Sequence, residues 1–246
     1  MDIRNHRMLE IALSMLEYIS TRPDGASFTD ICLTFSAPKS STHSLLSTME
    51  RMGYLQKDTS NKYFIGLKAF ELGSRFIENN DFYAYSRKVL SELVTELGET
   101  AHVAILEGCD VVYLSKFEFD NIIRMVSGIG KRIPAHASAV GKVLLSGKTD
   151  QELKDMYGGE KLKKLTDNTI DDLSILISQL EEIRRTGFGY EQEESSIGIR
   201  CIAVPVRDST GKIALGMSIS VPVRKGNLDH FKPALLNVKK KMERIL

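Results

Sequence analysis

The chain has 246 residues, of which 33 are basic and 32 acidic, so its formal net charge is +1. This balance excludes a molecule that binds polyanions over its whole surface and an acidic tail protein, and no apolar run approaches the ~20 residues of a membrane span. The three cysteines, Cys32, Cys109 and Cys201, are isolated and lack Cys-x-x-Cys spacing. We therefore expect a cytoplasmic protein of two domains, with no disulfide framework and no membrane partner.

Two helices are expected near the start of the chain. Apolar residues at helical spacing over 8–19 predict the first, which ends at the turn 23–25. Ser27 is suited to cap the second, because its hydroxyl can accept a hydrogen bond from the first turn of the helix. The break at 36–38 separates this helix from a third, and Pro38 suits the first position of that third helix.

The third helix is expected over 38–52 and carries the most informative surface of the chain. Leu45, Met49 and Met52 repeat at i, i+4 and i+7, so we expect them to face the core. On the opposite face lie short hydroxyls and a lysine, which are side chains that can reach DNA phosphates.

A hairpin is expected next, with strands at 54–57 and 62–65. Helix, turn, helix and hairpin in this order are typical of a winged helix-turn-helix domain, which we place at 1–66. His43 or Ser44 could then contact a base edge, whereas the alternative is an ordinary solvated helix face. The candidate DNA-binding residues are Lys39, Ser40, Ser41, Thr42, His43, Ser44, Ser47 and Lys62.

The charge of this segment is not that of a strong DNA binder. Residues 1–66 contain seven basic and seven acidic side chains, so their formal net charge is zero. DNA-binding modules are usually more basic, and one module of this kind should bind weakly. A dimer that covers two half-sites would strengthen the binding to double-stranded operator DNA.

The rest of the chain mixes helices and strands. We expect a linker helix over 67–80 and another helix over 82–97, with a hinge at 79–81. Antiparallel hairpins combined with helices indicate an α+β domain with a central sheet, which we place at 81–246. Its expected strands are 101–106, 111–114, 121–126, 188–192, 199–206 and 213–221, and its expected helices are 138–145, 171–186 and one from 228 onward.

One strand of this domain has two unlike faces. Over 213–221 the odd positions are bulky and apolar, and the even positions are small, including Ser218 and Ser220. A small face leaves room for a packed helix or for a ligand that the serines would hydrogen bond. The segment 134–142 is a helix start built from small residues, where backbone N–H groups could approach a carboxylate.

Several separate motifs resemble the IclR-type transcriptional regulators over nearly the whole chain. They are APKSSTHSLLSTMERMGYL and KYFIGLKAFELGS, and then GETAHVAILEGCDVVYL, RIPAHASAVGKVLL, LTDNTI, IRRTGFGYEQEESSIGIRCIAVPVRD and ALGMSISVP. The resemblance implies an α+β protein in which the linker helix joins the winged helix-turn-helix domain to a GAF-like effector domain. It also implies a homodimer or homotetramer that binds a small organic acid or aromatic compound and adjusts its occupancy of operator DNA.

The resemblance also implies which residues contact the effector. Position 191 is Glu where some members have Asp, which narrows the pocket by one methylene, and Val140 replaces a residue that is often smaller. By position, the effector pocket would include Ile122, Met125, Ile133, Ala139, Val140, Glu191, Cys201, Ser218 and Ser220.

Isolated residues suggest two other functions, an enzyme and a metal-binding protein. Cys201, His136 and Glu191 could be nucleophile, base and orienting group of a small-molecule enzyme, although the acidic run 191–194 is equally typical of a solvated loop. His102, His136, Cys109 and Cys201 carry no metal-ligand spacing. We therefore expect a ligand-responsive DNA-binding regulator without catalytic residues, metal or cofactor.

Overall fold

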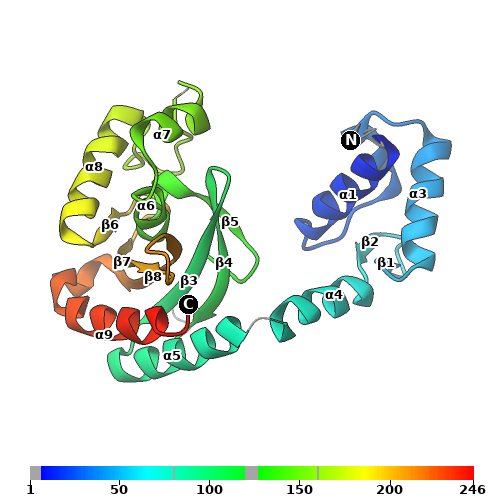
Figure 1. Cartoon of the computed structure of the whole chain (residues 1–246). Coiled ribbons are helices and arrows are strands. Elements are labelled where there is room, and N and C mark those ends of the chain that lie inside the picture. Colours follow the sequence, from blue (N-terminus) through cyan, green and yellow to red (C-terminus); the bar gives the residue numbers. More distant parts are fainter. Residues whose placement is uncertain (1–6, 80, 120–126, 160) are drawn as a thin grey trace. The chain divides into compact units, whose positions relative to one another are not determined.

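The computed structural model describes residues 7–79, 81–119, 127–159 and 161–246 (Figure 1). The strand expected at 121–126 therefore lies outside the described residues. The chain divides into two compact units, an N-terminal unit, Met1–Asn80, and a C-terminal unit, Asp81–Leu246. The described part of the chain contains no helix with both the length and the apolar character needed to cross a membrane.

The N-terminal unit contains three helices, a two-stranded antiparallel hairpin and a fourth helix. Ser27 caps the second helix as expected, because its Oγ accepts a hydrogen bond from the backbone N–H of Asp30 at 3.1 Å. Ser36, in the left-handed conformation, ends that helix. The elements are α1 (Arg7–Ser20), α2 (Phe28–Phe35), α3 (Lys39–Arg51), β1 (Leu55–Lys57), β2 (Tyr63–Ile65) and α4 (Leu67–Glu78).

The core of this unit corrects one expectation about α3. Thr42, Leu46 and Met49 face the core, whereas Leu45 is half-buried and Met52 is 54% exposed. Both sets have the i, i+4, i+7 spacing, so spacing alone could not choose between them. Met52 is exposed because α3 ends at Arg51 and Met52 is already its C-cap.

Helix α4 begins in close contact with the end of α3. A Cβ on Gly66 would lie 2.2 Å from the carbonyl oxygen of Gly53, so only glycine fits at this entry to the helix. Beyond that contact, no residue of α4 is buried within the described N-terminal unit. Its exposed apolar side chains are Leu67, Phe70, Leu72, Phe76 and Ile77.

The C-terminal unit is built on a six-stranded antiparallel sheet in the order β5-β4-β3-β8-β7-β6. Its strands are β3 (Thr100–Glu107), β4 (Asp110–Phe117), β5 (Arg132–Pro134), β6 (Gly189–Gln192), β7 (Ile199–Arg207) and β8 (Ile213–Pro222). Its α-helices are α5 (Asp81–Leu97), α6 (Ala139–Leu145), α7 (Asp150–Tyr157), α8 (Leu173–Thr186) and α9 (Lys232–Glu243). The short turns η1 (Ala135–Ala137), η2 (Val223–Lys225) and η3 (Leu228–Phe231) are 3-10 helices.

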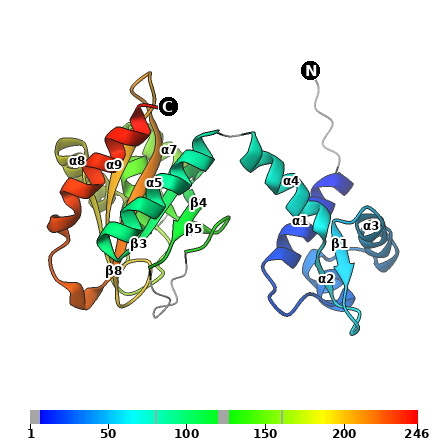
Figure 2. The same ribbon diagram turned by 90° about the horizontal axis from the view of Figure 1, so that it is seen from below.

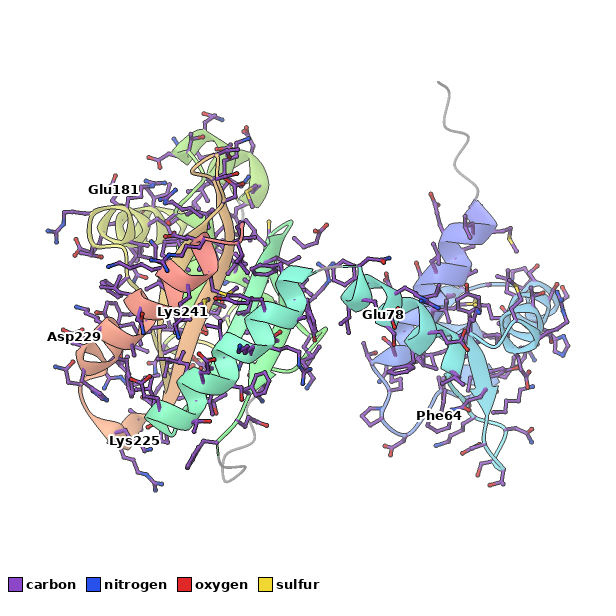
Figure 3. The ribbon with its side chains drawn as sticks, turned by 60° about the horizontal axis from the view of Figure 1, so that its bottom comes forward. Phe64, Glu78, Glu181, Lys225, Asp229 and Lys241 are labelled. Carbon is purple, nitrogen blue, oxygen red and sulfur yellow. The ribbon has the colours of Figure 1, made fainter. Side chains whose placement is uncertain are left out.

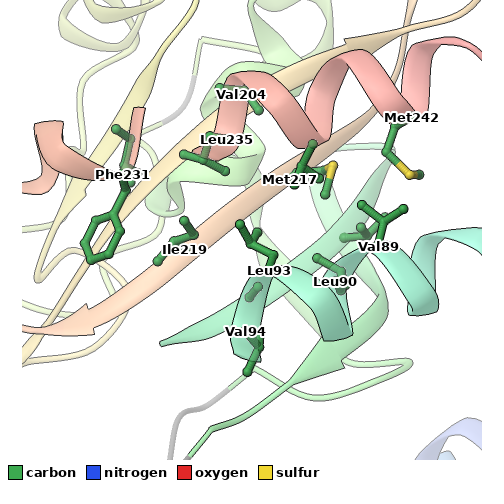
Figure 4. Packing of buried hydrophobic residues seen from close by; sticks show 14 of the residues in the cluster. Val89, Leu90, Leu93, Val94, Val204, Met217, Ile219, Phe231, Leu235 and Met242 are labelled. Atoms are coloured by element: carbon green, nitrogen blue, oxygen red, sulfur yellow. The ribbon is translucent and has the colours of Figure 1, made fainter. Parts of the chain in front are cut away.

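Helices α5 and α9 lie side by side on one face of this sheet (Figure 2). Val89 and Leu93 of α5 and Leu235 of α9 pack against Met217 and Ile219 of β8 (Figure 4). This result confirms the prediction of a buried bulky face for Leu215, Met217, Ile219 and Val221, whereas Ile213 is half-buried and packs against the other cluster. An ion pair from Lys241 to Glu92 at 3.0 Å joins α9 to α5 at the surface, and Lys225 of η2 pairs with Glu99, just before β3, at 2.6 Å (both lysines are labelled in Figure 3).

The opposite face of the sheet packs on α6 and α8. Gly216 of β8 faces α6 so closely that a Cβ would lie 2.6 Å from Cγ2 of Val140. Two and four positions further along the same face, Ser218 and Ser220 line a cavity instead. The packed-helix interpretation is therefore confirmed at Gly216, and the interpretation that a ligand lies against Ser218 and Ser220 stays a prediction.

Candidate functional site

The exposed face of α3 presents short polar side chains. Lys39, Ser40, His43 and Ser44 are exposed, and Ser41 and Ser47 are half-buried. Nδ1 of His43 lies 3.5 Å from Oγ of Ser47, one turn further along the helix. Such a face can place a positive charge and several hydroxyl groups against phosphates and base edges.

Two of the candidate DNA-binding residues do not lie freely on this face. Thr42 is fully buried among the inward positions of α3, so its side chain cannot contact DNA and its inclusion was wrong. Lys62, on the hairpin, is half-buried and its Nζ donates a hydrogen bond to the carbonyl oxygen of Asp24 at 3.2 Å. The hairpin turn itself is held by Asp58, whose carboxylate accepts the backbone N–H groups of Ser60 and Lys62 at 2.9 Å.

A small cavity with several serines in its wall lies between the sheet and α6 in the C-terminal unit. Its volume is about 20 Å³, which is room for about one water molecule. Of the residues implied by the resemblance, Ile133, Ala139, Val140, Cys201, Ser218 and Ser220 line it, and Ile122 and Met125 lie outside the described residues. The other lining residues are His102, Tyr113, Ser127, Ser138, Ser195, Ser196 and Ile199.

The sheet register explains this set. Ser220 pairs with Cys201, which pairs with Glu191, and the next inward row pairs His102 with Ser218. The expected strand 101–106 contained His102, but its neighbour on β8 depends on a pairing between residues more than 100 positions apart. The local pattern that could have indicated His102 is its place among small residues of β3 that face α6.

Glu191 lies beside the cavity and is fully buried, so the acidic run does not form a solvated loop at this position. Its Oε1 accepts the backbone N–H groups of Glu194 at 2.6 Å and Ser195 at 2.9 Å, and its Oε2 has no hydrogen-bond partner. Burial raises the pKa of the Glu191 carboxyl, and the two backbone donors oppose that shift.

The arrangement of Cys201 and His136 is unsuited to nucleophilic catalysis. Burial first, and the nearby Glu191 second, raise the pKa of the Cys201 thiol well above its usual range, and a protonated thiol is a weak nucleophile. The Sγ of Cys201 lies 3.0 Å from Oγ of Ser220. His136 instead bonds the carbonyl of Lys163 at 3.0 Å through Nε2 and packs edge-on against Tyr157.

A buried ion pair lies behind the cavity. Nζ of Lys142, on α6, is 2.5 and 2.7 Å from the two carboxylate oxygens of Glu194, and the lysine is 1% exposed. Burial lowers the pKa of Lys142, and the charge of Glu194 opposes that shift. Among residues 7–79, 81–119, 127–159 and 161–246, no group of three or more His, Cys, Asp or Glu side chains could hold a metal ion.

Comparison with known families and relatives gives a consistent result. The family described as "Bacterial transcriptional regulator IclR C-terminal" matches residues 74–245, and the "IclR helix-turn-helix domain" matches residues 8–59. The "HTH-type transcriptional repressor AllR" of Klebsiella pneumoniae is 34% identical over 224 residues, which cover 91% of this chain and 82% of the relative. The "HTH-type transcriptional regulator KdgR" of Escherichia coli K12 is 38% identical over 185 residues, covering 75% and 70%.

Solved structures agree with the fold. The crystal structure of the Thermotoga maritima IclR is 29% identical, with a TM-score of 0.77 and coverage of 98% of both chains. An IclR homolog from Microbacterium hydrocarbonoxydans, crystallised with 4-hydroxybenzoate, has a TM-score of 0.84 at 21% identity, with coverage of 96% of this chain and 98% of that one. The second similarity supports the fold alone.

Proposed function

Because this chain belongs to the IclR family of bacterial transcriptional regulators, we propose that it binds operator DNA through α3 and that a small organic acid in the cavity controls this binding. In this proposal residues 1–66 bind DNA, residues 67–80 link the domains, and residues 81–246 bind the effector. The DNA contacts come from the exposed and half-exposed candidates on α3 and from Lys62. A DNA-binding regulator acts where the chromosome lies, which supports a cytoplasmic location.

The observation that carries the effector part is the serine-rich cavity over a face of small residues. The Oγ of Ser138, which lines the cavity, accepts the backbone N–H of Gly141 at 3.1 Å. The hydroxyl groups of Ser138, Ser218 and Ser220 can donate hydrogen bonds to a carboxylate. The Microbacterium relative holds an acid of this kind, 4-hydroxybenzoate. No catalytic step is required of Cys201, His136 or Glu191.

In this proposal the effector controls DNA binding by shifting the protein between two arrangements of its subunits. An effector changes DNA affinity only if it binds one arrangement better than the other. A coupling free energy of about 1–3 kcal/mol is typical and changes operator affinity by about fivefold to 150-fold. This size of effect is sufficient for a regulatory switch.

Titration of the protein against DNA from upstream of its own gene tests the DNA part. We expect retardation at low salt. The affinity should fall steeply as salt rises, because protein binding releases cations from the DNA phosphates and this release is less favourable at high salt. Absence of retardation at low salt, with protein shown to be dimeric, would contradict the proposal. A thermal-shift screen of small carboxylates tests the effector part, because a ligand stabilises in proportion to the logarithm of its concentration over Kd.

Self-association into a homodimer or homotetramer is part of the same proposal. Phe70 of α4 is 71% exposed, and Met8, Leu9 and Leu13 of α1 are also exposed. Contiguous exposed apolar surface on a helix marks an interface. We expect Phe70→Glu to weaken self-association by about tenfold or more, since it would bury an unpaired charge. Asn79→Glu, at the exposed C-cap of α4, makes the same change in net charge and is the control, and sedimentation velocity is the measurement.

Equal weakening by Phe70→Glu and Asn79→Glu would assign the effect to added negative charge rather than to the apolar face. No change with Phe70→Glu would show that α4 lies outside the interface.

A further inference from the structure

A groove in the C-terminal unit lies at the end of the sheet remote from the cavity. It is lined by the ends of β3, β7 and β8, by the turn between β7 and β8, and by the segment from the end of α6 to α7. Its volume is about 510 Å³, and small-molecule sites typically have volumes of about 300–1,000 Å³. β3, β8 and α6 each contribute residues to the groove and to the cavity, but no described residue lines both. The groove is therefore a separate space with room for a ligand.

The groove lies where two neighbouring strands of the sheet stop pairing. The last pair that joins β3 to β8 is Ala104 with Gly216. Beyond it, among the described pairings, residues 105–107 of β3 and 213–215 of β8 have no partner in the opposite strand. Ala214 is also the extra residue of a bulge against β7. Backbone N–H and C=O groups along the two separated edges are therefore available to a polar ligand.

The wall between these strand ends is apolar. The side chains of Ile105, Leu106 and Ile213 are half-buried there, and the buried Leu144 of α6 lies against the same space. Covering apolar surface that is still exposed to water contributes about 25 cal/mol per Å² to binding. This part of the groove therefore favours a ligand with an apolar body.

The rim of the groove is positively charged. Of the four ionisable side chains that line it, Lys148, Arg207 and Lys212 are cationic, and only Glu152 is acidic. Three cations and one carboxylate give the lining a formal charge of +2. Glu152 is already engaged at the start of α7, where its Oε2 accepts the backbone N–H of Thr149 at 2.7 Å. The rim therefore favours an anionic ligand.

The turn between β7 and β8 holds two of these cations in place. Nη1 of Arg207 donates to the carbonyl oxygen of Gly211 at 2.7 Å. Oδ1 of Asp208 accepts the backbone N–H groups of Thr210 and Lys212 at 2.8 and 3.1 Å, which fixes the turn between them. The side chains of Arg207 and Lys212 are exposed, so a ligand can reach them. A guanidinium group can bind two oxygens of a phosphate or carboxylate at once.

We propose that this groove is a second ligand site, which binds a small organic dianion with an apolar body, such as an aromatic phosphate ester or an aromatic dicarboxylate. The negative charges lie at the rim with Arg207 and Lys212, and the apolar body lies between Ile105 and Ile213. A dianion matches the formal charge of the lining, whereas an inorganic anion leaves the apolar wall in water. The proposal concerns a site distinct from the effector cavity and does not depend on it.

Calorimetric titration of the full-length protein with phenyl phosphate tests this site, at about pH 7.5 where a phosphate monoester is mostly a dianion. Inorganic phosphate carries the charge without the apolar body, and phenol carries the ring without the charge. We expect phenyl phosphate to bind at least about tenfold more tightly than either. Isophthalate replaces the phosphate by two carboxylates, and its comparison with phenyl phosphate shows which dianion the groove prefers.

Variants of the rim locate the bound probe. Arg207→Gln with Lys212→Gln should weaken the binding of phenyl phosphate by about tenfold or more, because it removes two charged donors. Lys88→Gln with Lys240→Gln removes the same charge from exposed positions on α5 and α9, and should change the affinity by less than about twofold. Ala214→Leu leaves every charge in place but fills part of the groove, so it should also weaken binding.

Three results would overturn the proposal. The first is no binding of either dianion up to about 10 mM, a concentration at which even weak ligands bind. The second is equal affinity for phenyl phosphate and inorganic phosphate, which would indicate an adventitious ion only. The third is an affinity that is unchanged in both groove variants, or lowered equally by the control pair, which would place the probe elsewhere. If the rim variant shows no cooperative thermal transition, Ala214→Leu alone decides.

Discussion

Replacing Lys142 with methionine is expected to lower the free energy of unfolding of the C-terminal unit by about 3–5 kcal/mol. The lysine contacts both carboxylate oxygens of Glu194 and also donates to the carbonyl of Tyr190 at 3.3 Å. Methionine fills much of the same volume but leaves the carboxylate of Glu194 buried without its cation. Chemical denaturation followed by circular dichroism measures the loss.

The double variant Lys142→Met with Glu194→Gln separates the unpaired charge from the loss of packing. It removes both charges, so we expect it to recover most of the stability lost in the single variant. Lys154→Met replaces an exposed lysine on α7 and should change stability by less than about 0.5 kcal/mol. If the double variant were as unstable as the single one, the cost would come from packing and not from charge.

Replacing Ser44 with glutamate is expected to lower operator affinity by about a hundredfold or more. Ser44 is exposed on the outer face of α3, and glutamate is a good helix former, so the fold should be unaffected. A carboxylate at this position would repel the phosphates and bury a charge against base edges, and a dimer would incur this cost twice. Fluorescence anisotropy with labelled operator DNA at fixed salt measures the change.

Ser178→Glu is the matched control for this variant. Ser178 is exposed on α8 of the C-terminal unit, and the substitution makes the same change in net charge. Its operator affinity should stay within about twofold of wild type, because exposed charges beyond a Debye length are screened. Equal losses in the two variants would indicate a general charge effect and would remove α3 as the DNA-reading helix.

The local elements of the N-terminal unit could be predicted because their information is local. The cap at Ser27, the break before α3 and the alternation of the hairpin all depend on residues within a few positions of one another. Which face of α3 points to the core was harder to predict, because the set with Thr42 and the set with Met52 have the same spacing. Only the packing of α3 against α1 and α2 distinguishes the two sets, and the sequence of α3 alone does not determine that packing.

The cavity shows where sequence reasoning stops. The small face of β8 indicated space, and Ser218 and Ser220 were predicted from it. The pairing of β3 with β8 was not predictable from spacing, so His102 was missed as part of the wall. Lys142 is a similar case, because its partner Glu194 lies 52 positions away and a lysine beside small residues gives no sign of being buried. Helix α7 and strand β5 are short and were not anticipated.

Strand β8 belongs to two layers at once, since Ser218 and Ser220 touch the cavity while Met217 and Ile219 pack against α5. Alternate residues on one strand cannot move independently, because they share a backbone held by hydrogen bonds to β3 and β7. Any displacement that an occupant imposes on the serines must therefore be absorbed by the side chains behind them. Helix α5 is the first element of its unit and follows directly in sequence after α4 of the DNA-binding unit. It is therefore the element of the C-terminal unit through which a ligand in the cavity would act on the DNA-binding unit.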